Sequence, residues 1–254
     1  MIMKTISLNN SAFISVDNTK TFEDQNLNEL YVKEWEDVAV LSKKILDLCK
    51  TYGMFTINVL EKHPLGHISL AANYKDKNVF DLITYEEVKE WTEENNGIGE
   101  RAEFSLSELK KFLSEVGSQR LWPDHSIQNT EWVELMEPLK EAEFDLTIVK
   151  GTNPGREAYS GFDETELEQK LQTKEIKKLF ISGLATDYCV GKTAEHASDK
   201  WFEVYLLSDA IRGVAESSTK EMFDILTAKW VKSITSEEFQ DSISQNFDPE
   251  KITD

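Results

Sequence analysis

Short apolar runs alternate along this chain with stretches whose apolar residues recur at helical spacing. The runs that we interpret as strands cover residues 12–16, 54–60, 144–149, 179–182, 204–207 and 231–234. The helices include one with Val38, Leu41, Ile45 and Leu48 on a single face, and residues 164–173 and 217–229. Strands that alternate with helices pair in parallel and are covered on both faces. The sequence therefore predicts a Rossmann-like, three-layer α/β/α fold with a mainly parallel sheet.

The length and charge fit one globular domain with a small-molecule partner. A chain of 254 residues can bury a large core, and the length does not require a second domain. The formal charge of −19 opposes binding to nucleic acid or to an anionic membrane, and no basic cluster offsets it. We therefore expect a single domain over residues 1–254, with neither of those partners, and leave a homo-oligomer open.

Cysteine usage indicates a reducing compartment. The chain has two cysteines, Cys49 and Cys189, and it shows neither a signal peptide nor an apolar run of about eighteen residues. Proteins of the cytoplasm keep their thiols reduced. We therefore expect a cytoplasmic protein without a structural disulfide.

Residues 75–121 interrupt the alternation with a polar segment. Residues 86–94 and 107–116 have the pattern of polar helices, the second with Ser107 as its N-cap. Because the segment falls between two loops that contain histidine, it could cover a site there. A solvated insertion without a catalytic part has a similar sequence, so both interpretations stay open. The polar tail, residues 237–254, is expected to be loosely packed.

Several predicted strands end at residues that can do chemistry. Asp17, Glu61 and Lys150 each come directly after an apolar run. In a parallel sheet covered on both faces, ligands bind beyond the carboxyl ends of the strands. These side chains are therefore expected at one edge of the sheet.

Cys189 lies at the strand-to-helix turn in KLFISGLATDYCVG. Backbone N–H groups and the helix dipole favour a negative charge at such a turn, so Cys189 is a candidate nucleophile. The alternative is a small buried thiol under a helix. Two partners favour the nucleophile, because Asp17 could take the thiol proton and Lys150 could supply positive charge beside a thiolate.

Three of the four histidines fall in two loops marked by proline. His63 and His67 lie in EKHPLGHISLAANY, two and six residues after Glu61, and His125 lies in LWPDHSIQNT. Imidazoles with a carboxylate form a mixed N/O set that suits a divalent metal. Paired surface histidines are also common, so the spacing alone does not decide. His196, in the helix after Cys189, is interpreted as an ordinary packed or surface histidine.

These motifs, in this order, resemble those of the nicotinamidases among the isochorismatase-like cysteine hydrolases, from about Phe13 to Ile234. The matching stretches are VDNTKTF, HPLGHISLAAN, LWPDHSIQNT, Lys150-Gly151, YSGF at 159–162, GLATDYCVGKTA and LSDAIRG. The resemblance implies an amidohydrolase that converts nicotinamide to nicotinate and ammonia through a cysteine thioester, for NAD salvage. Another hydrolase of the superfamily, acting on a different small amide, and a non-catalytic binding protein on this fold are the alternatives.

The resemblance also implies roles for individual residues. Asp17, Lys150 and Cys189 would form the catalytic triad, and the backbone N–H groups of Ala185 and Cys189 the oxyanion hole, with a cis peptide before Ala185. The ligands of one divalent metal, zinc first and iron or manganese as alternatives, would be Glu61, His63 and His125, with His67 as a further candidate. The residues that would contact the substrate are Phe22, Trp122 and Tyr159.

The chain departs from the family pattern around the metal loops. Glu61 stands where the family has an aspartate ligand, so its carboxylate is one methylene longer. Thr19 and Thr21 stand where the family has a glutamine and a second aspartate, and Ser126 replaces the cysteine after the loop histidine. These changes keep the triad but put the metal preference in question.

Overall fold

A computed structural model of the chain describes residues 8–23 and 30–246, and a six-stranded parallel sheet lies at its centre. The strand order is β5-β2-β1-β6-β7-β8. The strands are β1 (Ser11–Val16), β2 (Phe55–Glu61), β5 (Leu146–Lys150), β6 (Lys178–Leu184), β7 (Glu203–Arg212) and β8 (Lys232–Ile234). The prediction of a mainly parallel sheet is confirmed, and β7 runs further than the predicted 204–207.

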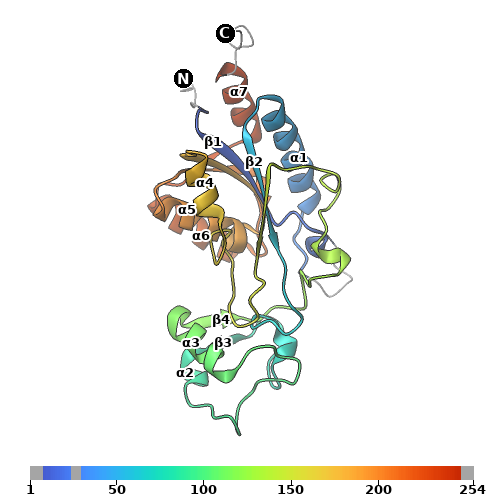
Figure 1. Cartoon of the computed structure of the whole chain (residues 1–254), viewed down its shortest axis with the longest axis vertical. Helices are drawn as coiled ribbons and strands as arrows, with labels where there is room; N and C mark the ends of the chain where they lie inside the picture. Colours follow the sequence, from blue (N-terminus) through green and yellow to red (C-terminus); the bar gives the residue numbers. More distant parts are fainter. Residues whose placement is uncertain (1–7, 24–29, 247–254) are drawn as a thin grey trace.

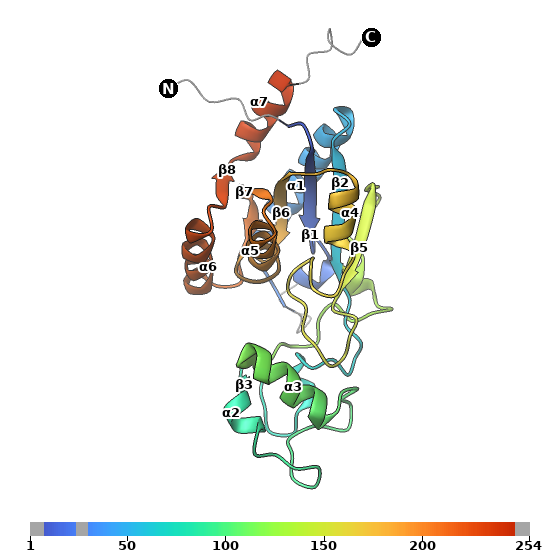
Figure 2. The ribbon, with the colours of Figure 1, turned by 60° about the vertical axis from the view of Figure 1, so that its left-hand side comes forward.

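Helices cover both faces of this sheet (Figures 1 and 2). One face carries α1 (Trp35–Thr51) and α7 (Ser236–Asn246), and the other carries α4 (Leu167–Thr173), α5 (Gly191–Asp199) and α6 (Glu216–Ala228). Successive strand residues point to opposite faces, so Ile14 packs in the core under α5 and α6 while Phe13 packs under α1. No helix in the described part of the chain is both long and apolar enough to cross a membrane.

The strand register brings the predicted site residues to one edge. Val16 of β1 pairs with Gly183 of β6, and Glu61 of β2 pairs with Lys150 of β5. All four are at or next to the carboxyl ends of their strands, where a parallel sheet places its ligand sites. Gly183 has φ +122°, and a Cβ there would lie 1.9 Å from the carbonyl oxygen of Val16. The close approach of β6 to β1 at this pair therefore requires glycine.

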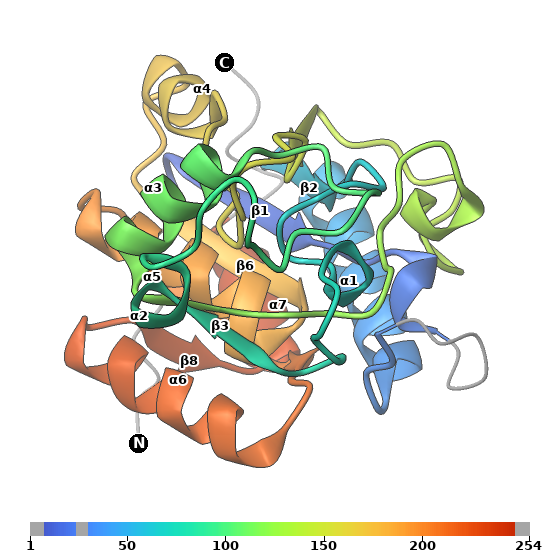
Figure 3. The same cartoon turned by 90° about the horizontal axis from the view of Figure 1, so that it is seen from below.

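The insertion forms a separate lobe beyond that edge (Figures 1 and 2), and seen from below it lies in front of the strands of the sheet (Figure 3). It contains β3 (Leu82–Thr84), α2 (Tyr85–Val88), α3 (Leu106–Val116) and β4 (Ser118–Arg120), with β3 and β4 antiparallel. It has its own core, in which Ile83, Leu109 and Leu113 are fully buried.

Two details of the insertion differ from the prediction. The helix predicted over 86–94 ends at Val88, and turns between Thr92 and Asn96 follow it. The second helix begins at Leu106, one residue earlier than predicted, and its N-cap is Ser105 rather than Ser107. The hydroxyl of Ser105 accepts from the Glu108 N–H while the Glu108 carboxylate accepts from the Ser105 N–H, a reciprocal cap that Ser107 cannot make because Lys110 lies three residues on.

The prediction of a loosely packed tail is wrong for residues 237–246. These residues belong to α7, where Phe239 and Ile243 are fully buried. The ring of Phe239 lies 4.7 Å from that of Phe180 on β6, so the helix completes the core on the α1 side. Residues 247–254 lie outside the described residues.

Replacing Phe239 with alanine is expected to lower the free energy of unfolding by about 3–5 kcal/mol. The variant loses the transfer free energy of a fully buried aromatic ring, and the core is left with a cavity. Urea unfolding would measure the change. Gln240→Ala, on the exposed face of the same helix, is the control and should stay within about 0.5 kcal/mol of the parent. Equal midpoints for Phe239→Ala and the parent would mean that α7 contributes nothing to the core.

Candidate active site

Four buried polar side chains meet beyond the carboxyl ends of β1, β2, β5 and β6. The Nζ atom of Lys150 lies 2.7 Å from Glu61 Oε1, 3.1 Å from Asp17 Oδ2 and 3.3 Å from Cys189 Sγ. The predicted trio of Asp17, Lys150 and Cys189 is therefore brought together, although its first and last members are 172 positions apart in the chain. Glu61 joins it as a fourth member, since its Oε1 contacts Lys150 and also accepts from the Cys189 thiol at 3.7 Å.

Local backbone features aim these side chains at one point. Asp17 donates its N–H to the Val59 carbonyl at 2.9 Å, which continues the pairing of β1 with β2, and its φ of 48° puts the backbone in the left-handed region where β1 ends. Cys189 lies in a π-helical turn, Thr186–Val190, between β6 and α5. Single π turns of this kind are often found at functional sites. The peptide between Leu184 and Ala185 is cis, as expected.

Burial determines the protonation of the trio. It raises the pKa of Asp17 to about 6, with the positive charge of Lys150 acting in the opposite direction. Burial also raises the pKa of the Cys189 thiol well above its usual value, although Lys150 lies beside it. We expected the turn to favour a thiolate; instead the resting sulfur keeps its proton, so a base is needed to remove it.

Lys150 stays charged in this enclosed position. Burial works against the charge, but the adjacent carboxylates of Asp17 and Glu61 raise the pKa of Lys150 well above its usual value. Lysine is therefore a fixed cation here, and the proton that moves belongs to another group.

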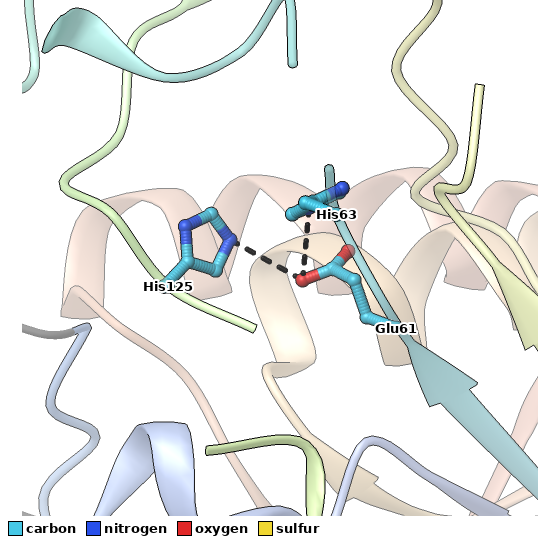
Figure 4. Close-up of side chains that lie close together, drawn as sticks. All are labelled: Glu61, His63 and His125. Atoms are coloured by element: carbon cyan, nitrogen blue, oxygen red, sulfur yellow. Dashed lines mark ion pairs between the residues drawn. The ribbon is translucent and has the colours of Figure 1, made fainter. Parts of the chain in front are cut away.

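Glu61, His63 and His125 form a second group that shares Glu61 with the first (Figure 4). Oε2 of Glu61 lies 3.4 Å from His63 Nε2 and 3.2 Å from His125 Nε2. Each imidazole is oriented by a backbone carbonyl, Gly151 for His63 and Pro123 for His125, at 2.9 Å from Nδ1. With Nδ1 as the donor, Nε2 of each ring presents a lone pair toward the carboxylate.

This arrangement fits a divalent metal ion. Nε2 of His63 is buried and has no hydrogen-bond partner among the described residues. A buried ring nitrogen in that state, facing a carboxylate and a second imidazole, is the donor set that a divalent cation satisfies. Gly151, at φ +71°, leaves space for the His63 ring, since a Cβ at this position would lie 2.7 Å from that ring.

His67 and His196 are placed differently. The His67 ring stacks on His63 with centroids 4.0 Å apart, and both of its nitrogens are engaged, by Ser69 Oγ at 2.8 Å and the Arg156 carbonyl at 3.0 Å. Burial lowers the pKa of His67 well below its usual value, so the ring is neutral. The two ring nitrogens of His67 are therefore bonded to Ser69 and Arg156 and not to Glu61, His63 or His125. His196 lies 3.2 Å from Asp163 at the surface, as an ordinary histidine.

A small cavity joins these groups to the predicted substrate contacts. Its walls include Phe22, Trp122, Tyr159 and Ala185 as well as Glu61, His125 and Cys189. The Trp122 indole donates to the Tyr159 hydroxyl at 3.0 Å, which fixes the indole plane. All the aromatic residues singled out from the sequence therefore face one space.

Sequence reasoning missed three residues of this cavity, Leu30, Tyr188 and Val214. Tyr188 packs edge-on against Trp122, with ring centroids 4.7 Å apart. Its position directly before Cys189 was a signal that could have identified it. Leu30 and Val214 are single apolar residues in irregular segments, and nothing in the local pattern marks them.

The departures from the family pattern lie beside the histidine loops. The Thr21 hydroxyl accepts from the Ser126 N–H at 2.9 Å and so connects the loop after β1 with the loop of His125. The Thr19 and Ser126 hydroxyls are buried and have no hydrogen-bond partner among the described residues. Hydroxyl groups thus stand where the family pattern has a second aspartate, at Thr21, and a cysteine, at Ser126.

The fold and these motifs define the class of protein. Residues 11–238 match the isochorismatase domain family, and the chain belongs to that family. Within it, the predicted resemblance to nicotinamidases is confirmed. The nicotinamidase of Escherichia coli strain K12 is 28% identical over 191 residues, which cover 73% of this chain and 76% of that protein. The nicotinamidase of Schizosaccharomyces pombe is 36% identical over 120 residues, which cover 45% of this chain and 54% of that protein.

Solved structures share the fold. A nicotinamidase pyrazinamidase from Acinetobacter baumannii superimposes with a TM-score of 0.71 at 24% identity, covering 91% of this chain and 98% of that one. The pyrazinamidase of Pyrococcus horikoshii, in complex with zinc, has a TM-score of 0.64 at 26% identity and covers 89% of this chain and 99% of that one. The predicted isochorismatase-like α/β fold is therefore confirmed.

Proposed function

We propose that this protein is a nicotinamidase, which hydrolyses nicotinamide to nicotinate and ammonia in NAD salvage. One observation carries the proposal: Cys189 of the first cluster and Glu61 and His125 of the second line the same small cavity with aromatic walls. Lys150 and His63 contact these lining residues, and Asp17 contacts Lys150. A small aromatic amide needs a nucleophile at its carboxamide and planar groups against its ring. Both are present within the same space.

The first half of the proposed reaction uses Asp17 as the base. The ionised carboxylate takes the thiol proton of Cys189 as the sulfur attacks the carboxamide carbon, and a C–S bond forms. The negative charge on the oxygen is stabilised by the N–H groups of Ala185 and Cys189. The C–N bond then breaks, and Asp17 returns the proton to the departing ammonia. Lys150, held between Asp17 and the sulfur, offsets the negative charge that moves between them.

The second half releases the acid. Water attacks the thioester carbon while Asp17 accepts one of its protons, the C–S bond breaks, and Asp17 gives that proton to the sulfur. The carboxyl proton passes to solvent, nicotinate leaves, and the starting protonation state is restored.

Glu61, His63 and His125 would hold the metal, and the residues Phe22 and Trp122 would lie against the two faces of the pyridine ring. The metal, when bound, supplies an electrophilic contact for the ring nitrogen, directly or through water, and so orients the substrate. We propose zinc first, because imidazole and carboxylate suit it and a related pyrazinamidase is in complex with it; iron and manganese fit the same donors. His67 would support His63 rather than complete the ligand set. Both cysteines are free thiols, which supports the proposed location in the cytoplasm.

The experiment that tests this function measures ammonia release from nicotinamide by the purified protein. A panel of benzamide, pyrazinamide and aliphatic amides separates a nicotinamidase from a hydrolase of another small amide. Release of ammonia from an aliphatic amide but not from nicotinamide would overturn the proposal.

The pH profile of this activity should report the state of Asp17. Because burial raises its pKa to about 6, and only the ionised carboxylate can take the thiol proton, kcat/KM should fall about tenfold per unit below that pH. Assays from pH 5 to 8 would show this limb. Metal content measured at each pH is the control, since loss of metal in step with activity would assign the limb to the histidines instead.

A further inference from the structure

The insertion places one arginine between the two histidine loops. The Arg101 guanidinium donates from Nε to Asn73 Oδ1 at 2.7 Å, and from Nη1 and Nη2 to the two carboxylate oxygens of Asp124 at 2.6 and 2.7 Å. The side chains of Arg101 and Asp124 are 28% and 38% exposed, so water screens the pair only in part. A planar fork with two parallel N–H groups matches a carboxylate in both distance and direction.

Asn73 connects this contact to the first histidine loop. Its side chain is fully buried, and its amide group donates to the carbonyl oxygens of Leu65 and His67 at 3.2 and 2.7 Å. Next to it, Glu103 of the insertion donates its N–H to the Gly66 carbonyl at 3.0 Å. The backbone that follows His63 is therefore fixed from the side of the insertion.

Asp124 connects the same arginine to the second histidine loop. It directly precedes His125, whose Nδ1 lies 2.9 Å from the carbonyl of Pro123, the residue before Asp124. Fixing the Asp124 side chain thus restricts the short segment that orients the His125 ring. Through Asn73 and Asp124, one guanidinium restricts both loops that carry imidazole.

We propose that Arg101 is a positioning residue that clamps the two loops, so that His63 and His125 are held at metal-binding separation from Glu61. This inference rests on the proposed metal site. It makes the insertion part of the metal centre. Residues that orient metal ligands without touching the metal are typically worth about 10–100-fold in metal affinity.

The test measures the affinity of the full chain for Zn²⁺ alone, by competition with a chromophoric chelator and without nicotinamide. Arg101→Ala should bind Zn²⁺ about 10–100-fold more weakly than the parent. Arg101→Lys should lose nearly as much, because one ammonium cannot replace the planar fork between Asn73 and Asp124. Asp124→Ala should resemble Arg101→Ala, and the double variant should be no weaker than either, since all three lack the same contact.

Glu115→Ala is the matched control. Glu115 on α3 pairs with Arg156 at 2.6 Å, with side chains 41% and 36% exposed, so it also ties the insertion to the rest of the chain. Among the described residues, the partner of its carboxylate is Arg156, and it contacts neither histidine loop. Affinity for Zn²⁺ should therefore stay unchanged in this variant.

Excess Zn²⁺ should also return the KM of Arg101→Ala toward the parental value while kcat changes little.

Three results would overturn the clamp. Parental Zn²⁺ affinity in Arg101→Ala and Arg101→Lys would show that the contact does not position the ligands. An equal loss in Glu115→Ala would mean that docking of the insertion as a whole is what matters. No Zn²⁺ binding by the parent would remove the metal site itself, whereas ammonia release from nicotinamide would still test the proposed function. If circular dichroism shows that Arg101→Ala does not fold, Arg101→Lys and Asp124→Asn decide.

Discussion

Cys189→Ala is expected to abolish nicotinamide hydrolysis, lowering kcat by at least about a thousandfold. The reason is that the sulfur is the only atom in the cluster that can form the thioester, and Lys150 next to it is a fixed cation. The measurement is ammonia release at saturating nicotinamide, together with mass spectrometry of the acid-quenched parent. An acyl group should be found on Cys189 in the parent and be absent from the variant.

Asp17→Asn should come close to the same loss. Asparagine keeps the shape of the side chain but cannot accept the thiol proton, and residues that act as one unit fail together. Lys150→Ala should be similarly severe, because it removes the cation that lies within 3.3 Å of the sulfur and leaves Asp17 and Glu61 buried without it. Its thermal unfolding must be measured alongside the activity, so that loss of fold is not counted as loss of chemistry.

The second cysteine provides the control. Cys49 is buried on α1, and its thiol lies 3.7 Å from the sulfur of Met54, in the core on the α1 side. Burial raises the pKa of Cys49 far above its usual value, and no cation among the described residues lies beside it, so Cys49→Ala should keep full activity. The mechanism fails if either Cys189→Ala or Asp17→Asn retains more than about a tenth of parental turnover.

The fold and the trio could be predicted because both depend on rules that act locally or through topology. Apolar runs separated by helical periodicity define parallel strands, and the carboxyl ends of such strands meet. Asp17 and Lys150 directly follow apolar runs, so a parallel sheet places both at the same edge; the strand order β5-β2-β1, which brings them within contact, was not predicted. The motif around Cys189 supplied the third member.

What the sequence did not predict depends on contacts between distant segments. Among the described residues of α7, the buried apolar side chains are Phe239 and Ile243. They belong to a core cluster with Phe180 of β6 and Tyr205 of β7, which are distant in the chain. The Arg101 and Asp124 pair joins two irregular segments, which carry no periodicity to read. The cap at Ser105 was different: serine followed three residues later by glutamate is a local signal that Ser107 lacks.

Glu61 is the residue whose role changed most between sequence and structure. Its position suggested a metal ligand with an extra methylene. The register of β2 against β5 places it opposite Lys150, so one carboxylate oxygen contacts the cation of the trio while the other faces the two imidazoles. The added length therefore lets one side chain connect the two halves of the site.

Glu61→Ala is accordingly expected to lower both substrate binding and turnover. Loss of a ligand should remove the metal and raise KM by at least about tenfold, because the ring loses its orienting contact. Loss of the carboxylate at 2.7 Å from Lys150 should also lower kcat, since the lysine then has Asp17 as its remaining carboxylate contact among the described residues. Metal analysis and steady-state kinetics on the same preparation would measure both effects.

Chelation of the parent separates these two roles of Glu61. Removing the metal alone should raise KM with a smaller change in kcat, and iodoacetamide should still alkylate Cys189, because Asp17 and Lys150 stay in contact. Glu61→Asp restores the shorter ligand that the family resemblance implies and should keep its metal. Unchanged metal content and KM in Glu61→Ala would show that Glu61 is not a ligand, and another group, with His67 the first to test, would then have to complete the site. A kcat that falls equally on chelation and in Glu61→Ala would instead mean that the contact with Lys150 adds nothing to turnover.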